Sequence, residues 1–122
     1  MARNHDIGKG LLVILRRPPL ISRKGAEGLR MAVGQSMTNR VTVVLVDAGV
    51  WLAGPLKPEL VAGGEAGKHL GMLLRLKQRV WVEAESVARH GLDVQLLHEG
   101  VEVVARERID RELLAADAVV VY

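Results

Sequence analysis

The chain has 122 residues, of which 49% are hydrophobic and none is cysteine. This composition fits one globular domain with a buried core, and it excludes a disulfide, a thiolate nucleophile and a persulfide on this chain. The net charge of +3 is uneven, because residues 1–40 hold eight Lys or Arg against two acidic side chains and the remainder is acidic overall. The basic amino-terminal third predicts either a solvated surface or contact with an acidic partner.

The first half of the chain predicts two buried strands. Residues 1–10 mix polar and charged groups with glycine, so we expect a flexible segment ahead of a single domain at residues 11–122. The apolar runs at residues 11–15 and 41–46 are typical of strands buried on both faces.

A helix is predicted between these strands, at residues 24–38. Leu29, Val33 and Met37 recur at helical spacing and are expected to face the core. Three glycines weaken this helix, and we expect them to allow close packing against the sheet: Gly25, Gly28 and Gly34.

A second helix is predicted at residues 65–77, after a segment rich in Gly and Pro that reads as a short helical turn and a loop. Its apolar positions share one face: Ala66, Leu70, Leu73 and Leu74. Trp51 lies in the preceding segment and is either a core residue or part of a subunit interface. The predicted interface consists of Val50, Trp51, Leu52 and Leu56.

Residues 79–92, RVWVEAESVARHGL, change from a strand to a short helix. The helix is expected at residues 84–90, with Gly91 as a left-handed cap. Strand ends and helix amino termini converge at the carboxyl edge of a parallel sheet, where open α/β proteins keep their ligand sites. Glu83 and Glu85, at the join, are therefore candidate site residues.

The last third predicts a strand at residues 101–105, near a sheet edge because charges flank it, and a final strand at residues 118–122. Asp110 is a plausible amino-terminal cap for a helix that reaches residue 116 and buries Ile109, Leu113 and Leu114. Alternating strands and helices predict an α/β fold, a three-layer α/β/α sandwich with a mainly parallel sheet of about five strands.

Charged residues are predicted to converge at the carboxyl edge of this sheet. Arg16 and Arg17 follow the first strand and Asp47 ends the second, so with Glu83 and Glu85 they are expected to line a cleft. Either they form a binding pocket, or Asp47 pairs with an arginine and the glutamates stabilise a helical turn. No phosphate-loop motif follows either strand, so a nucleotide site lacks support.

Four segments resemble the DsrE/DsrF-like sulfur-relay proteins, most closely the DsrF or TusC branch. They are RRPP at residues 16–19, AGVWLAGPLKPELV at 48–61, the strand-to-helix join at 79–92, and IDRELLAADAVVVY at 109–122. In sulfur-carrying members the join holds a cysteine, and the position that corresponds to it here is Glu83. The resemblance implies a subunit of a DsrEFH-like or TusBCD-like complex that serves tRNA thiolation or sulfur oxidation.

Because the cysteine is absent, we predict a non-catalytic subunit. The resemblance implies that its partners are related DsrE/DsrH-like (TusD/TusB-like) subunits, or further copies of itself as a homo-oligomer, and a sulfur-acceptor protein. Two alternatives remain open: a stand-alone homo-oligomeric module that binds a small ligand or nucleotide, and a hydrolase that uses Glu83 with Asp47.

Several other partners and locations are not expected. No apolar run approaches the roughly 20 residues of a membrane span, and the amino terminus lacks the apolar middle of a signal peptide, which predicts a cytoplasmic protein. The four histidines lack ligand spacing, so no metal site or cofactor is predicted. With two Trp, one Tyr and no Phe, direct binding of nucleic acid through base stacking is not expected.

Overall fold

The computed structural model describes residues 8–19, 22–55 and 66–122. Five strands form one sheet in the order β4-β3-β2-β1-β5, and every neighbouring pair is parallel. The predicted parallel α/β sheet is therefore confirmed. The strands are β1 (Gly10–Leu15), β2 (Arg40–Leu45), β3 (Arg79–Glu83), β4 (Glu102–Val104) and β5 (Ala118–Val121).

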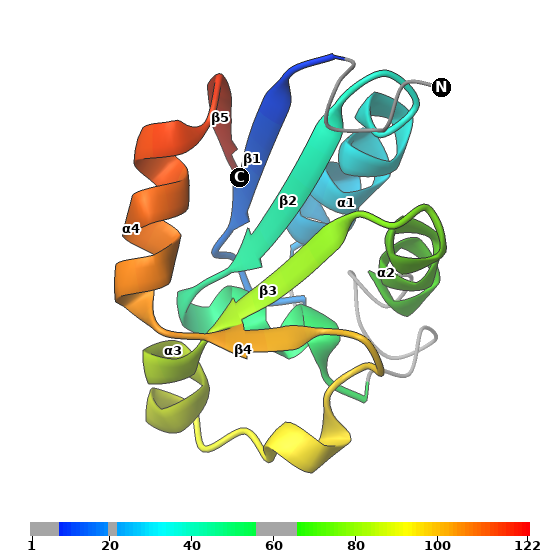
Figure 1. Cartoon of the computed structure of the whole chain (residues 1–122). Helices are drawn as coiled ribbons and strands as arrows, with labels where there is room; N and C mark the ends of the chain where they lie inside the picture. The colour runs from blue at the N-terminus through cyan, green and yellow to red at the C-terminus, as the bar shows by residue number, and fades with distance from the viewer. Residues whose placement is uncertain (1–7, 20–21, 56–65) are drawn as a thin grey trace.

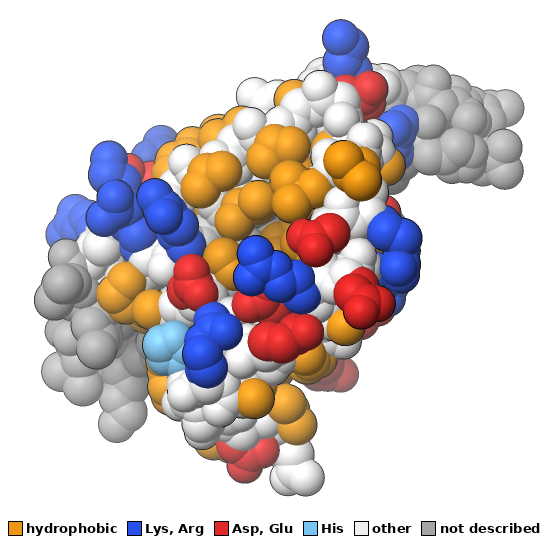
Figure 2. Space-filling model, turned by 90° about the vertical axis from the view of Figure 1, so that its left-hand side faces the viewer, with side chains coloured by type: hydrophobic (Ala, Val, Ile, Leu, Met, Phe, Trp, Pro, Cys, Tyr) orange, Lys and Arg blue, Asp and Glu red, His pale blue; other side chains and the backbone are white. Residues whose placement is uncertain are grey.

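Helices lie on both faces of the sheet (Figure 1). On one face lie α1 (Lys24–Gln35) and α2 (Ala66–Arg75), and on the other lies α4 (Arg106–Ala115). Figure 2 looks onto the side that carries α4, where hydrophobic side chains gather in a broad patch bordered by charged ones. The predicted three layers are present. One outer layer contains α1 and α2, whereas the other contains α4 alone.

Short helices connect the strands at the carboxyl edge of the sheet. The 3-10 helix η2 (Asp47–Ala53) follows β2, α3 (Ala84–Arg89) follows β3, and η3 (Val94–Leu96) precedes β4. Gly91 has φ 62° and its N–H donates to the carbonyl of Ala88 at 3.1 Å, which confirms the left-handed cap predicted after α3. No helix in the described ranges has the length and apolar character needed to cross a membrane.

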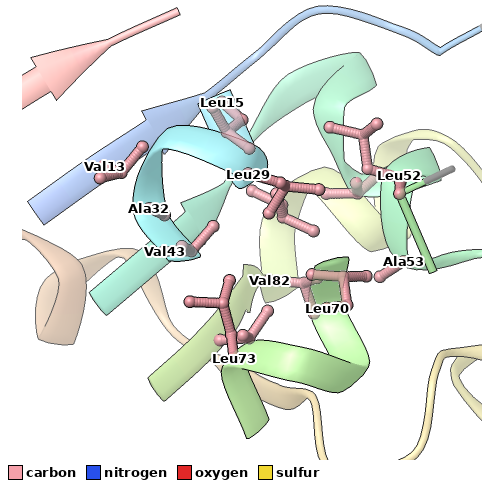
Figure 3. Close-up of a cluster of buried hydrophobic side chains, with 14 of the residues drawn as sticks. Val13, Leu15, Leu29, Ala32, Val43, Leu52, Ala53, Leu70, Leu73 and Val82 are labelled. Carbon is pink, nitrogen blue, oxygen red and sulfur yellow. The ribbon is translucent and has the colours of Figure 1, made fainter. Parts of the chain in front are cut away.

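Alternate strand residues supply two separate cores, because successive side chains point to opposite faces of a sheet. The larger core lies beneath α1 and α2 and includes Val13, Val43 and Val82, which meet Leu29 and Leu73 of the helices (Figure 3). The smaller core lies beneath α4 and consists of Leu12, Val44, Trp81, Val104 and Ile109.

Helix α1 is shorter than predicted, and two of its three predicted core residues face the core: Leu29 is 0% exposed and Val33 packs against the larger core. It ends at Gln35, where the hydroxyl of Ser36 donates to the carbonyl of Val33 at 2.6 Å and the chain turns toward β2. Met37 lies beyond this turn and is 75% exposed, so its predicted place in the core is wrong. Besides Leu29, the buried residues of α1 are Gly25, Gly28 and Ala32.

Two of the three glycines of α1 allow close packing, and one of these, Gly28, packs against the sheet as predicted. A Cβ on Gly28 would lie 2.5 Å from the side chain of Leu15 in β1, and a Cβ on Gly25 would lie 2.5 Å from Leu52 in η2. A Cβ on Gly34 would meet no described atom of another element within 4 Å, so the prediction fails there. Close approach of α1 to the sheet and to η2 therefore depends on Gly25 and Gly28.

Helix α4 begins earlier than predicted, at Arg106, so Asp110 lies inside it and is not its cap. The first N–H group of the helix, from Arg106, donates to the carboxylate of Glu85 at 3.2 Å, and this contact from α3 caps the helix instead. Ile109 is buried as predicted, but Leu114 is 90% exposed.

The remaining boundaries differ from the predictions by a few residues. Gly10 opens β1, one residue before the predicted strand, and β4 is an edge strand as predicted. Residues 1–7 of the predicted flexible amino terminus lie outside the described residues, as do Leu56 of the predicted interface and Glu65 of the predicted helix.

Candidate functional site

Glu83 is the last residue of β3 and the residue that precedes α3. Its backbone is extended, with φ −71° and ψ 122°, so the chain turns directly from strand into helix at this point. The join lies at the carboxyl edge of the parallel sheet, where the sequence predicted it. Glu83 is only 3% exposed, which makes it a buried acidic residue in a small domain.

Three side chains surround the carboxylate of Glu83. The hydroxyl of Ser86 donates a hydrogen bond to Oε1. The guanidinium of Arg89 lies 3.9 Å from Oε1, and that of Arg106 lies 3.7 Å from Oε2. A buried carboxylate needs a hydrogen bond and compensating charge, and these contacts supply both.

Ser86 connects this carboxylate to the end of β2. Its side-chain oxygen accepts hydrogen bonds from the backbone N–H of Asp47 at 2.8 Å and from Arg89 at 3.1 Å. The carboxylate of Asp47 in turn pairs with Arg89 at 2.8 Å. Asp47 therefore pairs with an arginine, as one interpretation of the sequence had it, but the partner is Arg89 of α3 and not Arg16 or Arg17.

Glu85 points away from its own helix. Both of its carboxylate oxygens accept from the backbone N–H of Arg106, at 3.2 and 3.4 Å. Since the side chain of Arg106 also approaches Glu83, the two glutamates together fix the start of α4 above the end of β3. The cluster of Asp47, Glu83, Glu85, Ser86, Arg89 and Arg106 is called the join network below.

Arg16 and Arg17 do not belong to the join network. Both are exposed, and neither has an ion pair within the described ranges. The backbone N–H of Arg16 donates to the carbonyl of Tyr122 at 3.3 Å, which places it at the carboxyl end of β1 beside β5. The structure thus brings three of the five predicted cleft residues together and leaves the two arginines apart from them.

The join network holds three carboxylates and two guanidinium groups, and its central carboxylate has little access for a substrate. Asp47, Glu83 and Glu85 carry the negative charges, and Arg89 and Arg106 carry the positive ones. Glu83 is 3% exposed, so the carboxylate that a hydrolase would use as its acid or base is buried. A cavity of about 490 Å³ lies elsewhere, at the amino ends of β1, β2 and β3, where its lining includes Arg40, Lys77 and Arg79.

The segment around Trp51 is mostly interior. Val50 and Leu52 are 0% and 1% exposed and belong to the larger core, whereas Trp51 is partly exposed. The indole N–H of Trp51 donates to Nδ1 of His90 at 3.4 Å, and the two rings meet edge to face with centroids 6.5 Å apart. Of the described residues in the predicted interface, Trp51 is thus the one with a side chain at the surface.

Sequence reasoning missed three members of the join network, Ser86, Arg89 and Arg106. A signal for two of them was present, because Glu83, Ser86 and Arg89 are spaced by three residues and so share one face of the helix that follows the strand. Arg106 had no such signal, since it approaches Glu83 only through the packing of α4.

Comparisons with known proteins agree with this architecture. A sequence model described as the DsrE/DsrF-like family matches residues 9–122. The structure of the ychN protein from E. coli is similar with a TM-score of 0.80 and 18% identity, over 94% of this chain and 100% of that one. MTH1491 from Methanobacterium thermoautotrophicum, described as a protein of unknown function, gives a TM-score of 0.71 and 16% identity over the same shares. No curated protein matches the chain in sequence.

Proposed function

The chain belongs to the DsrE/DsrF-like family, whose members have roles in sulfur relay, and we propose that it is a subunit that carries no sulfur itself. A relay passes a sulfane sulfur from a persulfide to an acceptor thiolate, so each carrier needs a cysteine. This chain has none, and Glu83 occupies the join to which the family resemblance assigns the sulfur-carrying residue.

The observation that carries this proposal is the burial of Glu83 within the join network. Its carboxylate lies close to side chains of α3 and α4, and through Ser86 it is connected to Asp47 of η2. Glu83 thus ties three helices to the end of β3, which is a structural role. A buried carboxylate that holds these elements together suits a subunit that carries no sulfur itself.

The partners that fit this role are related DsrE/DsrH-like (TusD/TusB-like) subunits, which supply the cysteine in a complex that serves tRNA thiolation or sulfur oxidation. Trp51 supports docking near the join, because it is partly exposed and its ring contacts His90 at the end of α3. Purification through a tag on this chain, followed by native mass spectrometry, tests the assembly. Cysteine-containing subunits of similar size in a fixed ratio are expected, and recovery of this chain alone would contradict the proposal.

A direct test of the non-carrier role uses the purified chain, a cysteine desulfurase and a persulfide donor. The intact mass is expected to stay unchanged after incubation, because the chain has no thiol to accept sulfur. A stable gain of one sulfur atom per chain would contradict the proposal.

Glu83→Cys tests the position itself. Arg89 and Arg106 approach the wild-type carboxylate within 4 Å, so a thiolate placed there is expected to be stabilised and the thiol pKa lowered. Met37→Cys is the matched control, since Met37 is 75% exposed and lies in the turn after α1. Thiolate absorbance measured against pH should give a lower thiol pKa for Glu83→Cys than for Met37→Cys. An equal or higher pKa would contradict the view that the join can stabilise a thiolate.

The second candidate function is a stand-alone homo-oligomer that binds a small anion. The cavity of about 490 Å³ at the amino ends of the strands favours it, because Arg40, Lys77 and Arg79 line that cavity. Arg79 is already paired with Glu112 at 3.1 Å, which weakens the attraction for an anion. Native mass spectra that retain a bound anion on the purified chain would favour this candidate over the relay subunit.

A further inference from the structure

Arg16 and Arg17 lie outside the join network, but they belong to a basic surface at the same edge of the sheet. They follow the end of β1, and Arg23 and Lys24 lie at the start of α1, so the chain brings both pairs to the carboxyl edge. All four side chains are exposed. This surface is called the basic edge below, and it consists of Arg16, Arg17, Arg23 and Lys24.

Both pairs of cations border the 3-10 helix η2. A Cβ on Gly49 of η2 would lie 3.0 Å from Cα of Arg16. A Cβ on Gly25, the second residue of α1, would lie 2.5 Å from the side chain of Leu52 in η2. The two pairs, which are separate in the sequence, therefore flank one short helix. Trp51 of the same helix is partly exposed and adds an aromatic side chain to this part of the surface.

The cations of the basic edge have no counter-charge within the described part of the chain. None of the four side chains forms an ion pair or a hydrogen bond with another described residue. Other arginines approach a carboxylate at 3.9 Å or less: Arg40, Arg79, Arg89, Arg106 and Arg108. The basic edge thus differs from the surface around α3 and α4, where arginines are paired.

This arrangement is unfavourable for the fold itself. Like charges repel when they have no counter-charge, and Arg23 and Lys24 also lie at the amino end of α1, where the helix dipole is positive. Glu27, in the first turn of α1, is exposed and pairs with neither of them. Residues that lower stability where they lie, with no contact that offsets the loss, are expected at functional surfaces.

The composition of this surface favours an acidic polypeptide over a nucleic acid. Guanidinium groups pair with carboxylates in a two-point geometry, and an apolar side chain of such a segment can pack on Trp51. A nucleic acid carries a phosphate at every nucleotide, and these would repel Glu27. Trp51 is a single ring whose N–H is already bonded to His90, whereas surfaces that bind single strands stack successive bases on aromatic rings.

We propose that the basic edge binds an acidic polypeptide segment of a partner protein, with carboxylates on the four cations and an apolar side chain on Trp51. In an extended segment alternate side chains share one face, so acidic residues at every second position reach the basic edge together. This inference rests on the proposed role as a subunit that docks other proteins, and it specifies the chemistry of one partner. It does not require that the partner carry sulfur.

A labelled peptide in which glutamate alternates with leucine tests the binding, by fluorescence anisotropy on the purified chain. It should bind with an affinity that falls as salt is added, and a peptide with glutamine at the glutamate positions should not bind. Arg16→Ser together with Arg17→Ser should raise the dissociation constant by on the order of tenfold or more.

Arg75→Ser together with Arg111→Ser is the matched control. These arginines are also exposed and have no ion pair in the described structure, but they lie on α2 and α4. Both double variants lose the same charge, so only a contact at the basic edge distinguishes them. An equal loss of affinity in the two would show that net charge alone attracts the peptide, and it would overturn the proposal.

Further measurements separate the remaining outcomes. Removal of like charges at the basic edge should leave the unfolding temperature unchanged or raise it, which shows that weaker binding does not come from a damaged fold. A peptide with serine in place of leucine should bind the wild type more weakly, and Trp51→Ala should remove that difference.

Two results would contradict the choice of partner. A labelled RNA duplex that binds more tightly than the peptide, and that is released by Arg16→Ser with Arg17→Ser, would overturn the polypeptide in favour of a nucleic acid. If the glutamate peptide does not bind while the tagged chain still recovers cysteine-containing subunits, this inference fails and the proposed function stands.

Discussion

The same five strands supply both faces of the sheet, yet α1 and α2 pack on one face and α4 alone packs on the other. The strand order explains this difference. From β1 to β3 the chain advances in one direction, so right-handed crossovers place α1 and α2 on one face. The return from β4 to β5 reverses direction and places α4 on the opposite face. A single helix must therefore cover a whole face, and it leaves part of it open.

Trp81 gives the α4 face its largest buried side chain, and it offers the sharpest test of this difference. It is 0% exposed, and the guanidinium groups of Arg79 and Arg108 lie 4.8 and 4.7 Å from its ring. Trp81→Ala should lower the free energy of unfolding by about 4 kcal/mol, because it removes the anchor beneath α4. Chemical denaturation monitored by circular dichroism measures the loss.

Trp81→Phe separates the packing of the ring from its polar atom. The indole N–H of Trp81 is buried and has no hydrogen-bond partner among the described residues, and phenylalanine lacks this group. The variant no longer buries an unpaired N–H, and this gain should offset part of the stability lost with the smaller ring. The free energy of unfolding should therefore stay within about 1 kcal/mol of the wild-type value. A loss as large as that of Trp81→Ala would show that the indole nitrogen has a partner in solution.

Leu73→Ala probes the well-covered face. Leu73 of α2 is 0% exposed within the larger core, and its truncation should cost about 3 kcal/mol through lost transfer energy and a residual cavity. The value should fall below that of Trp81→Ala because many neighbours share the packing on this face. Leu114→Ala, the same change at a side chain that is 90% exposed, is the control and should leave the stability of the isolated monomer nearly unchanged.

The first two strands could be predicted because each is mostly apolar, with Thr42 as the one polar residue within the two runs. Residues 11–15, and residues 41–46 apart from Thr42, are apolar on both faces of the sheet, and this pattern does not depend on which helix covers them. The residue at which α1 ends, and the side of α4 that faces the sheet, could not be predicted in the same way. Leu113 and Leu114 are adjacent, so two helical stripes fit the sequence, and only the position of the sheet decides that Leu114 is exposed. The cap of α4 by Glu85 is a contact between separate elements that no local pattern encodes.

For the join network, the place could be predicted and the pairing could not. A strand that changes to a short helix puts Glu83 at the carboxyl edge of the sheet, and this is where it lies in the structure. The partner of Asp47 depends on how α3 is rotated, which brings Arg89 to it from 42 residues away. Arg16 and Arg17 lie nearer in the sequence, but β1 ends on the far side of β2 from β3.

The smallest predicted effect tests whether arginine helps to hold α4 in place. Arg108 lies over the Trp81 ring and pairs with Glu102 at 2.7 Å, but its side chain is 47% exposed, so solvent screens both contacts. Arg108→Ala should therefore destabilise the fold by about 1 kcal/mol. Arg111→Ala in the monomer is the control, because Arg111 lies on the same helix and has no partner in the described residues. If the two variants have equal free energies of unfolding, the guanidinium of Arg108 over Trp81 does not contribute to stability. Apolar contact would then be the main interaction that holds α4 over Trp81.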